Sequence, residues 1–247
     1  MTRTARKQSG SGYMHLIVRG NGRQILFEDE QDHLVYLSLL KKYSAETNVK
    51  VCAYCLMENH VHLLAFDQED NVPLFMKKTG VSYARYYNTK YDRSGHLYQD
   101  RYKSEPIESE DYLLTVFRYI LNNPAKAGIC SAAEYRWSSY KAYSNPGAFV
   151  DPRVYRMFFE SWNVYADYIA AKNEDNCMEY EQRDRRQDDD WARSVIRKEL
   201  NLESGTMLQR QTHENRDAAL RLLKEKGLTI RQIERLTGIN RGVIQRA

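Results

Sequence analysis

Apolar and polar residues follow two different periods along the first half of the chain. Short apolar runs bounded by turn residues predict β-strands, and these fall at residues 13–18, 49–56, 60–66 and 102–107. Apolar residues three and four positions apart predict helices at 30–45 and 72–88. A further helix is expected between Ser109, a typical N-cap residue, and Pro124, which cannot continue a helix.

These elements follow one another as strand, helix, strand, strand, helix, strand, and then a last helix. The order is typical of a ferredoxin-like (RRM-like) α+β fold, in which an antiparallel sheet carries helices on one face. Pro106 has no N–H to donate to a neighbouring strand, so the last strand should lie at a sheet edge. We expect this domain to span residues 13–150, after a flexible leader at residues 1–12.

Residues 205–247 predict a separate, all-helical module. Helical patterns at 216–226, 229–236 and 241–246, with Gly238 in the last turn, resemble a helix-turn-helix. This segment has nine basic and four acidic residues, which favours an anionic partner. We therefore expect DNA binding, with Arg231, Arg241 and Arg246 as candidate contacts. The alternative is a helical hairpin that packs on the main domain.

Residues 151–204 are expected to connect the two parts. They have nine basic and thirteen acidic residues, and apolar spacing near 158–169 predicts a helix. The charge run at 183–190 is typical of a solvated helix end or a linker.

Composition excludes several classes of protein. With 247 residues, of which 42% are hydrophobic, the chain is not disordered as a whole, and it has no apolar run long enough for a transmembrane helix. The basic N-terminus leads into no apolar stretch, so it is not a secretory signal. Four cysteines do not make a disulfide framework, so we expect a cytoplasmic protein. Nineteen tyrosines are compatible with packing, with base stacking, or with a tyrosine nucleophile.

The strand at 60–66 contains a possible metal site. His60 and His62 point to the same face of a strand, and two neutral imidazoles can bind one divalent ion. The alternative is a pair of half-exposed strand histidines. Cys52 and Cys55 differ by an odd number of positions, so we expect them on opposite strand faces, as packing residues rather than zinc ligands.

The helix before Pro124 offers a second polar pair. Tyr119 and Asn123 are four residues apart, so a phenol and a carboxamide share one helix face. An Asn carbonyl oxygen is a usable third ligand for a divalent metal. Taken alone, the pair is also compatible with a surface tyrosine above an asparagine at the helix end.

Four segments in this order resemble the single-tyrosine HUH transposase superfamily (IS200-like), and within it the REP-associated tyrosine transposases. They are YCLMENHVHLL at 54–64, GHLYQDRYKS at 95–104, RYILNNPAKAG at 118–128 and YRWSSY at 135–140. The resemblance implies that 13–150 is a catalytic domain, that His60, His62 and Asn123 bind Mg²⁺ or Mn²⁺, and that Tyr119 is the nucleophile. Many relatives have proline where this chain has Glu58, which is either a carboxylate beside the metal or a solvated turn residue.

The resemblance also implies an activity. A transposase of this kind cleaves and rejoins single-stranded DNA through a covalent 5′-phosphotyrosine, at hairpins such as repetitive extragenic palindromes. We expect a nucleoid-associated monomer or homodimer, with basic residues near the site in contact with flanking phosphates: Arg19, Arg101, Lys103 and Arg118. The alternative is a non-catalytic DNA- or RNA-binding regulator on the same fold, because fold does not fix function.

Overall fold

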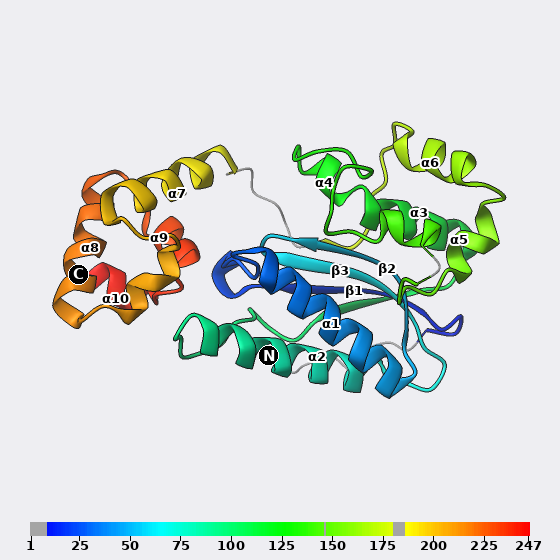
Figure 1. Cartoon of the computed structure of the whole chain (residues 1–247), viewed down its shortest axis with the longest axis horizontal. Helices are drawn as coiled ribbons and strands as arrows, with labels where there is room; N and C mark the ends of the chain where they lie inside the picture. The colour runs from blue at the N-terminus through cyan, green and yellow to red at the C-terminus, as the bar shows by residue number, and fades with distance from the viewer. Residues whose placement is uncertain (1–8, 146, 180–185) are drawn as a thin grey trace.

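Four strands form one antiparallel sheet at the centre of the fold (Figure 1). In this computed structural model, residues 9–145, 147–179 and 186–247 are described; leader residues 1–8 and positions 183–185 of the charge run lie outside them. The strand order is β2-β3-β1-β4. The strands are β1 (Tyr13–Arg19), β2 (Lys50–Met57), β3 (His60–Phe66) and β4 (Lys103–Ile107). The edge position predicted for the strand with Pro106 is confirmed.

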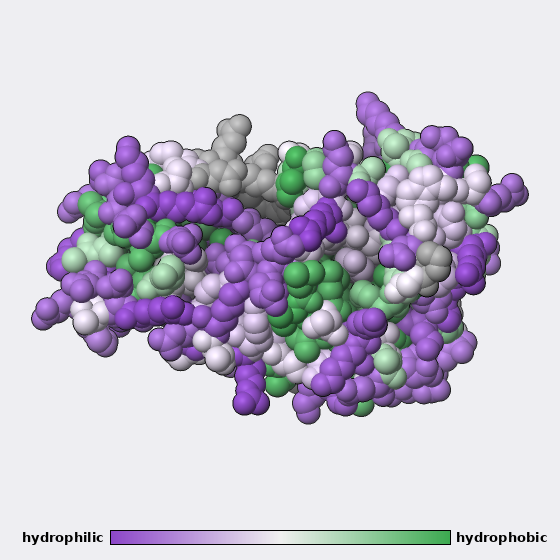
Figure 2. Space-filling model, in the orientation of Figure 1, coloured by the Kyte–Doolittle hydropathy of each residue, from purple (hydrophilic) through white to green (hydrophobic). Residues whose placement is uncertain are grey.

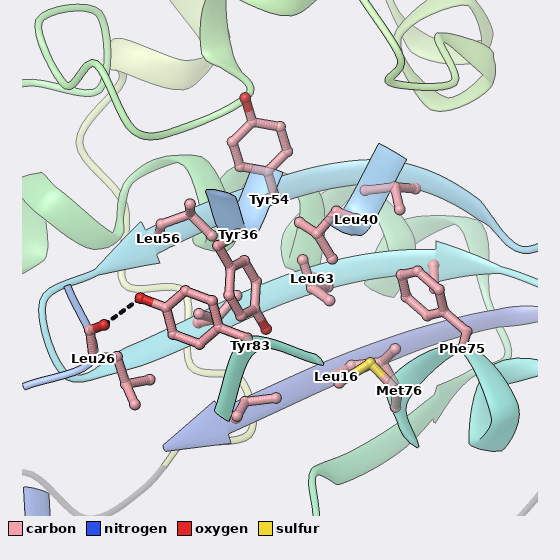
Figure 3. Packing of buried hydrophobic residues seen from close by; sticks show 14 of the residues in the cluster. Leu16, Leu26, Tyr36, Leu40, Tyr54, Leu56, Leu63, Phe75, Met76 and Tyr83 are labelled. Carbon is pink, nitrogen blue, oxygen red and sulfur yellow. Dashed lines mark hydrogen bonds between the residues drawn. The ribbon is translucent and has the colours of Figure 1, made fainter. Parts of the chain in front are cut away.

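Two helices cover one face of this sheet (Figure 1). They are α1 (Glu30–Thr47), which begins with a capping box between Asp29 and Asp32, and α2 (Val72–Lys90). Their apolar side chains form a core with alternate strand residues, as Figure 3 shows for Tyr36 on α1, Tyr83 on α2 and Leu63 on β3. The Tyr83 hydroxyl donates to the Leu26 carbonyl, so this buried phenol is satisfied.

A third helix, α3 (Glu110–Leu121), covers the opposite face of the sheet (Figure 1). Its N-cap is Ser109, whose side chain accepts from the Tyr112 N–H. The short elements around α3 complete a second core: α4 (Asn123–Lys126), η2 (Tyr140–Ser144), α5 (Arg153–Phe158) and α6 (Trp162–Ala170). The predicted α+β class is confirmed. The two helices that lie between strands in the sequence share one face as expected, whereas α3 covers the other face, so the sheet has helices on both sides.

A β-bulge in β2 overturns one expectation. Val51 pairs with Ala65 and Ala53 pairs with Leu64, so Cys52 is an extra residue in the ladder. The bulge reverses the alternation that follows it, and Cys52 and Cys55 therefore pack in the same cluster on the α3 side. The prediction that they lie on opposite faces was wrong. Both thiols are fully buried, which raises their pKa values and agrees with their predicted packing role.

The C-terminal helices pack around a third core, to which Ile25 of the sheet domain also contributes (Figure 1). They are α7 (Arg186–Leu200), η3 (Gly205–Arg210), α8 (His213–Glu225), α9 (Ile230–Thr237) and α10 (Arg241–Arg246). Gly238 ends α9 at a φ of 69°, a conformation that glycine adopts without strain. Ala192 and Ile196 of α7 join this core, whereas Val154 and Ile169 of α5 and α6 join the α3 side. The two halves of the predicted connector thus pack against different parts of the chain.

Polar contacts attach the C-terminal helices to the sheet domain. Arg193 on α7 forms an ion pair of 2.5 Å with Glu58, and the Ser204 hydroxyl donates to Glu28 over 2.9 Å. Glu58 in the β2–β3 turn is therefore held by α7.

Hydrophilic side chains cover most of the visible surface, including the C-terminal helices (Figure 2). Within the described residues, no helix is both long and apolar enough to cross a membrane.

Candidate active site

The register of the sheet gathers polar residues on the face that α3 covers. His60 and His62 alternate with the buried core residues Val61 and Leu63, so both lie on the α3 side. On β1, Arg19 pairs with His60, and Ile17 pairs with both His62 and Lys103. His15 on β1 pairs with Glu105 on β4, so these two titratable side chains lie on the same face as well.

The two histidines of β3 are packed closely together. Their ring centroids lie 5.0 Å apart, and the rings are nearly perpendicular. Nδ1 of His60 pairs with Oδ1 of Asn59 at 2.8 Å, and Nδ1 of His62 pairs with Nε2 of His15 at 3.0 Å. The Nε2 atoms would therefore be the ligand atoms for a metal. Burial, followed by the nearby His60 and His15, holds the pKa of His62 well below its usual value, which keeps the ring neutral as metal binding requires.

Tyr119 on α3 faces the same cluster. Its ring centroid lies 5.7 Å from that of His62 and 6.0 Å from that of His15, both in edge-to-face geometry. The side chain is 2% exposed, and its hydroxyl has no hydrogen bond of normal geometry among the described residues. Burial and the neighbouring Glu179 carboxylate raise the pKa of the phenol. The Lys126 ammonium lies 4.3 Å from the ring centroid.

Asn123 keeps its predicted relation to Tyr119 although the helix is interrupted. Helix α3 ends at Leu121, and Asn123 begins α4 after a single break at Asn122. Nδ2 of the buried Asn123 donates to the Tyr119 carbonyl over 3.2 Å. This bond fixes the carboxamide so that Oδ1 is the atom that a metal would contact.

The predicted metal ligands suit a hard or borderline divalent ion. Each of the three has its second polar atom engaged with protein: His60 with Asn59, His62 with His15, and Asn123 with a backbone carbonyl. No group of three His, Cys, Asp or Glu side chains able to hold a metal occurs within the described ranges. A site here therefore depends on the carboxamide as third ligand.

The predicted DNA contacts fall into three groups. Arg19 and Lys103 lie on the sheet face of the histidine cluster, and exposed Arg101 precedes β4. Arg118 is engaged elsewhere and is not a good candidate for DNA contact, because its Nε and Nη2 donate to both carboxylate oxygens of Asp175 at 2.6 and 2.7 Å. The three C-terminal arginines are exposed and distant in sequence from the cluster, and Arg241 pairs with Glu234 at 2.5 Å.

Sequence reasoning missed His15 and Glu105. His15 is fully buried, its pKa is lowered by burial, and its ring lies beside that of His62 with centroids 5.3 Å apart. Glu105 accepts from the Tyr112 hydroxyl over 2.8 Å and lies 3.8 Å from Nδ1 of His15. A polar residue inside an apolar strand was the available signal for His15. Its partner on β4 becomes evident only from the sheet register.

Comparison with known proteins gives a family match for the first half of the chain. Residues 8–123 match the sequence model of the family described as "Transposase IS200 like". This segment, just under half of the chain, resembles the IS200-like transposase family. The predicted family is thus confirmed. No curated protein matches the chain.

Two solved structures are similar to this IS200-like chain. A REP-associated tyrosine transposase bound to a REP hairpin has a TM-score of 0.52 and 15% identity, over 60% of this chain and 88% of that one. The likeness supports the fold. A putative transposase from Deinococcus radiodurans is 20% identical with a TM-score of 0.36, over 49% of this chain and 97% of that one.

Proposed function

We propose that this IS200-like protein cleaves and rejoins single-stranded DNA at hairpins, with Tyr119 as nucleophile. The observation that carries the proposal is the convergence of Tyr119 and the His60–His62 pair on one sheet face, with ring centroids of Tyr119 and His62 5.7 Å apart. One strand and one helix that are far apart in sequence supply these side chains, so no local pattern explains their convergence.

His60, His62 and Asn123 are the proposed metal ligands. The carboxamide oxygen suits Mg²⁺ or Mn²⁺, the two divalent ions proposed for this site, and the two imidazole nitrogens favour a borderline transition ion such as Mn²⁺. When bound, the ion supplies Lewis-acid polarisation of the scissile phosphate. The buried environment keeps His62 neutral, and the hydrogen bond from Asn123 to the Tyr119 carbonyl holds ligand and nucleophile in a fixed relation.

Tyr119 performs the covalent step. Its phenolate oxygen attacks phosphorus and forms the tyrosine 5′-phosphodiester, while the bond from phosphorus to the departing 3′ oxygen breaks and leaves a 3′-OH. Attack by another 3′-OH reverses the step and joins strands, so no external energy source is consumed. The Lys126 ammonium, 4.3 Å from the Tyr119 ring, favours the negative charge that develops there.

The DNA would cross the α3 side of the sheet. Arg19 and Lys103 on this face, with Arg101 beside it, are the proposed phosphate contacts. The similar structure contains a REP hairpin, which supports hairpin DNA as the ligand class. The exposed Arg231 and Arg246 of the C-terminal helices are proposed to hold flanking DNA. A non-catalytic regulator on the same fold would bind DNA without forming an adduct.

The proposal is tested with hairpin-bearing single-stranded DNA and Mn²⁺. Wild type should form a covalent protein–DNA adduct on a denaturing gel, and His62→Ala should lose both the adduct and Mn²⁺ binding. His33→Ala is the matched control, since His33 lies between Phe27 and Trp137 in stacked contacts remote from this cluster. Adduct formation by His62→Ala at the wild-type rate would contradict the assignment.

A further inference from the structure

The buried contact between His15 and His62 restricts where hydrogens can reside. Nε2 of His15 and Nδ1 of His62 face each other at 3.0 Å, and both side chains are at most 1% exposed. Two neutral imidazoles in this geometry have one hydrogen between them. That hydrogen belongs to His62 in one arrangement and to His15 in the other.

The two arrangements have opposite consequences for His62. If Nδ1 of His62 holds the hydrogen, its Nε2 has a lone pair and can bind a metal. If Nε2 of His15 holds the hydrogen, Nδ1 of His62 is the acceptor and its Nε2 is protonated. In that second arrangement His62 cannot be a ligand.

Glu105 favours the first arrangement. Its Oε2 accepts from the Tyr112 hydroxyl over 2.8 Å and lies 3.8 Å from Nδ1 of His15. When Nε2 of His15 is the acceptor for His62, Nδ1 of His15 has the hydrogen and presents a positive dipole to the carboxylate. In the second arrangement a lone pair would face the same negative charge. Nδ1 of His15 has no hydrogen bond of normal length within the described residues, so the nearby Glu105 carboxylate favours one of its two states. Of the two carboxylates that act on this ring, Glu105 has the larger effect and Glu179 the smaller.

Packing holds the His15 ring in the orientation that its hydrogen bond with His62 needs. It lies side by side with the His62 ring across the 3.0 Å nitrogen–nitrogen contact, with an interplanar angle of 24°, and it meets the Tyr119 ring edge-on at 70°. The ring therefore contacts both the proposed metal ligand and the proposed nucleophile. Neither Leu nor any other apolar residue at this position would supply an acceptor for Nδ1 of His62.

We propose that His15, oriented by Glu105, is a positioning residue that holds His62 with its hydrogen on Nδ1 and its lone pair on Nε2. The consequence for metal binding rests on the proposed function, whereas the preference between the two hydrogen positions does not. Loss of outer-shell partners of metal-binding histidines typically lowers metal affinity by roughly 10- to 100-fold. A similar loss is expected for His15→Leu.

The test begins with NMR of the metal-free full chain containing ¹⁵N-labelled histidine. His62 should have hydrogen on Nδ1 in wild type and in His15→Gln, whose side-chain carbonyl can still accept. His15→Leu should move the hydrogen to Nε2 or produce a mixture. Glu105→Gln changes a partly exposed strand residue, and it should shift the same signals even if His15→Leu fails to fold. His33→Leu should leave them unchanged.

Titration with Mn²⁺ alone supplies the second readout. The expected result is weaker binding by roughly 10- to 100-fold in His15→Leu, with recovery in His15→Gln. Hydrogen on Nε2 of His62 in wild type, or on Nδ1 in both His15→Leu and Glu105→Gln, would overturn the inference. If wild type has hydrogen on Nδ1 of His62 but binds no Mn²⁺, the proposed ligand set would be contradicted. The proposed control of His62 by His15 and Glu105 would still be supported.

Discussion

Glu28 should make the stability of the protein fall as the pH rises. Its carboxylate lies where the C-terminal helices meet the sheet domain, and it accepts from the Ser204 hydroxyl at 2.9 Å and the Tyr87 hydroxyl at 3.1 Å. Burial raises its pKa from 4.5 to about 7, against the smaller opposing effect of these two donors. Folding therefore favours the protonated carboxyl.

The sign and size follow from linkage. The folded state binds the proton more tightly than the unfolded state, so the free energy of unfolding is highest below pH 4.5 and falls as the pH rises to about 7. A displacement of this size corresponds to at most about 3.5 kcal/mol at 1.4 kcal/mol for each pH unit. Glu28→Gln is neutral at every pH and should remove this cost above pH 7.

Urea denaturation at several pH values between 5 and 8.5 measures the effect. Glu28→Gln should be more stable than wild type at pH 8.5 by up to about 3.5 kcal/mol, with a difference that shrinks toward pH 5. Glu225→Gln, which changes an exposed carboxylate on α8, should follow wild type at every pH. Parallel curves for Glu28→Gln and wild type would refute the reasoning.

Two further predictions concern the nucleophile and the C-terminal helices. Glu179→Gln removes the negative charge that raises the pKa of Tyr119, so covalent adduct should form roughly tenfold faster for each pH unit by which this pKa falls, measured by quenched time courses at fixed pH. Glu174→Gln in the same segment is the control, and equal acceleration in both variants would count against a specific effect. Arg231→Ala and Arg246→Ala should each reduce the salt dependence of DNA binding by about one phosphate contact, measured by binding titrations at several salt concentrations. An unchanged slope in both would exclude these arginines from the interface.

Periodicity was enough to predict most of the fold. The four strands, the helices α1 and α2 and the Ser109 cap arise from local patterns that tertiary contacts reinforce. The bulge at Cys52 was not predictable, because one inserted residue in a ladder leaves no mark in a fully apolar strand. It reversed the face of one cysteine and brought both to the α3 side.

The candidate site was predictable where its residues are close in sequence. His60 and His62 are two positions apart and Tyr119 and Asn123 are four apart, so strand and helix geometry relate each pair. His15 and Glu105 join the cluster only through the pairing of β1 with β3 and β4. Arg118 was misjudged for the same reason. It lies next to Tyr119 in sequence, but its ion pair with the distant Asp175 could not be predicted from that position.

Identification of the residue that becomes linked to DNA tests the central claim most directly. The full chain is incubated with hairpin-bearing single-stranded DNA and Mn²⁺, the covalent adduct is isolated under denaturing conditions, and the modified peptide is sequenced by mass spectrometry. Tyr119→Phe removes one oxygen that has no hydrogen bond of normal geometry among the described residues, so it should fold, bind DNA and form no adduct. We predict that DNA is attached to Tyr119 alone in wild type, whereas attachment to another tyrosine, or an adduct with Tyr119→Phe, would contradict the account.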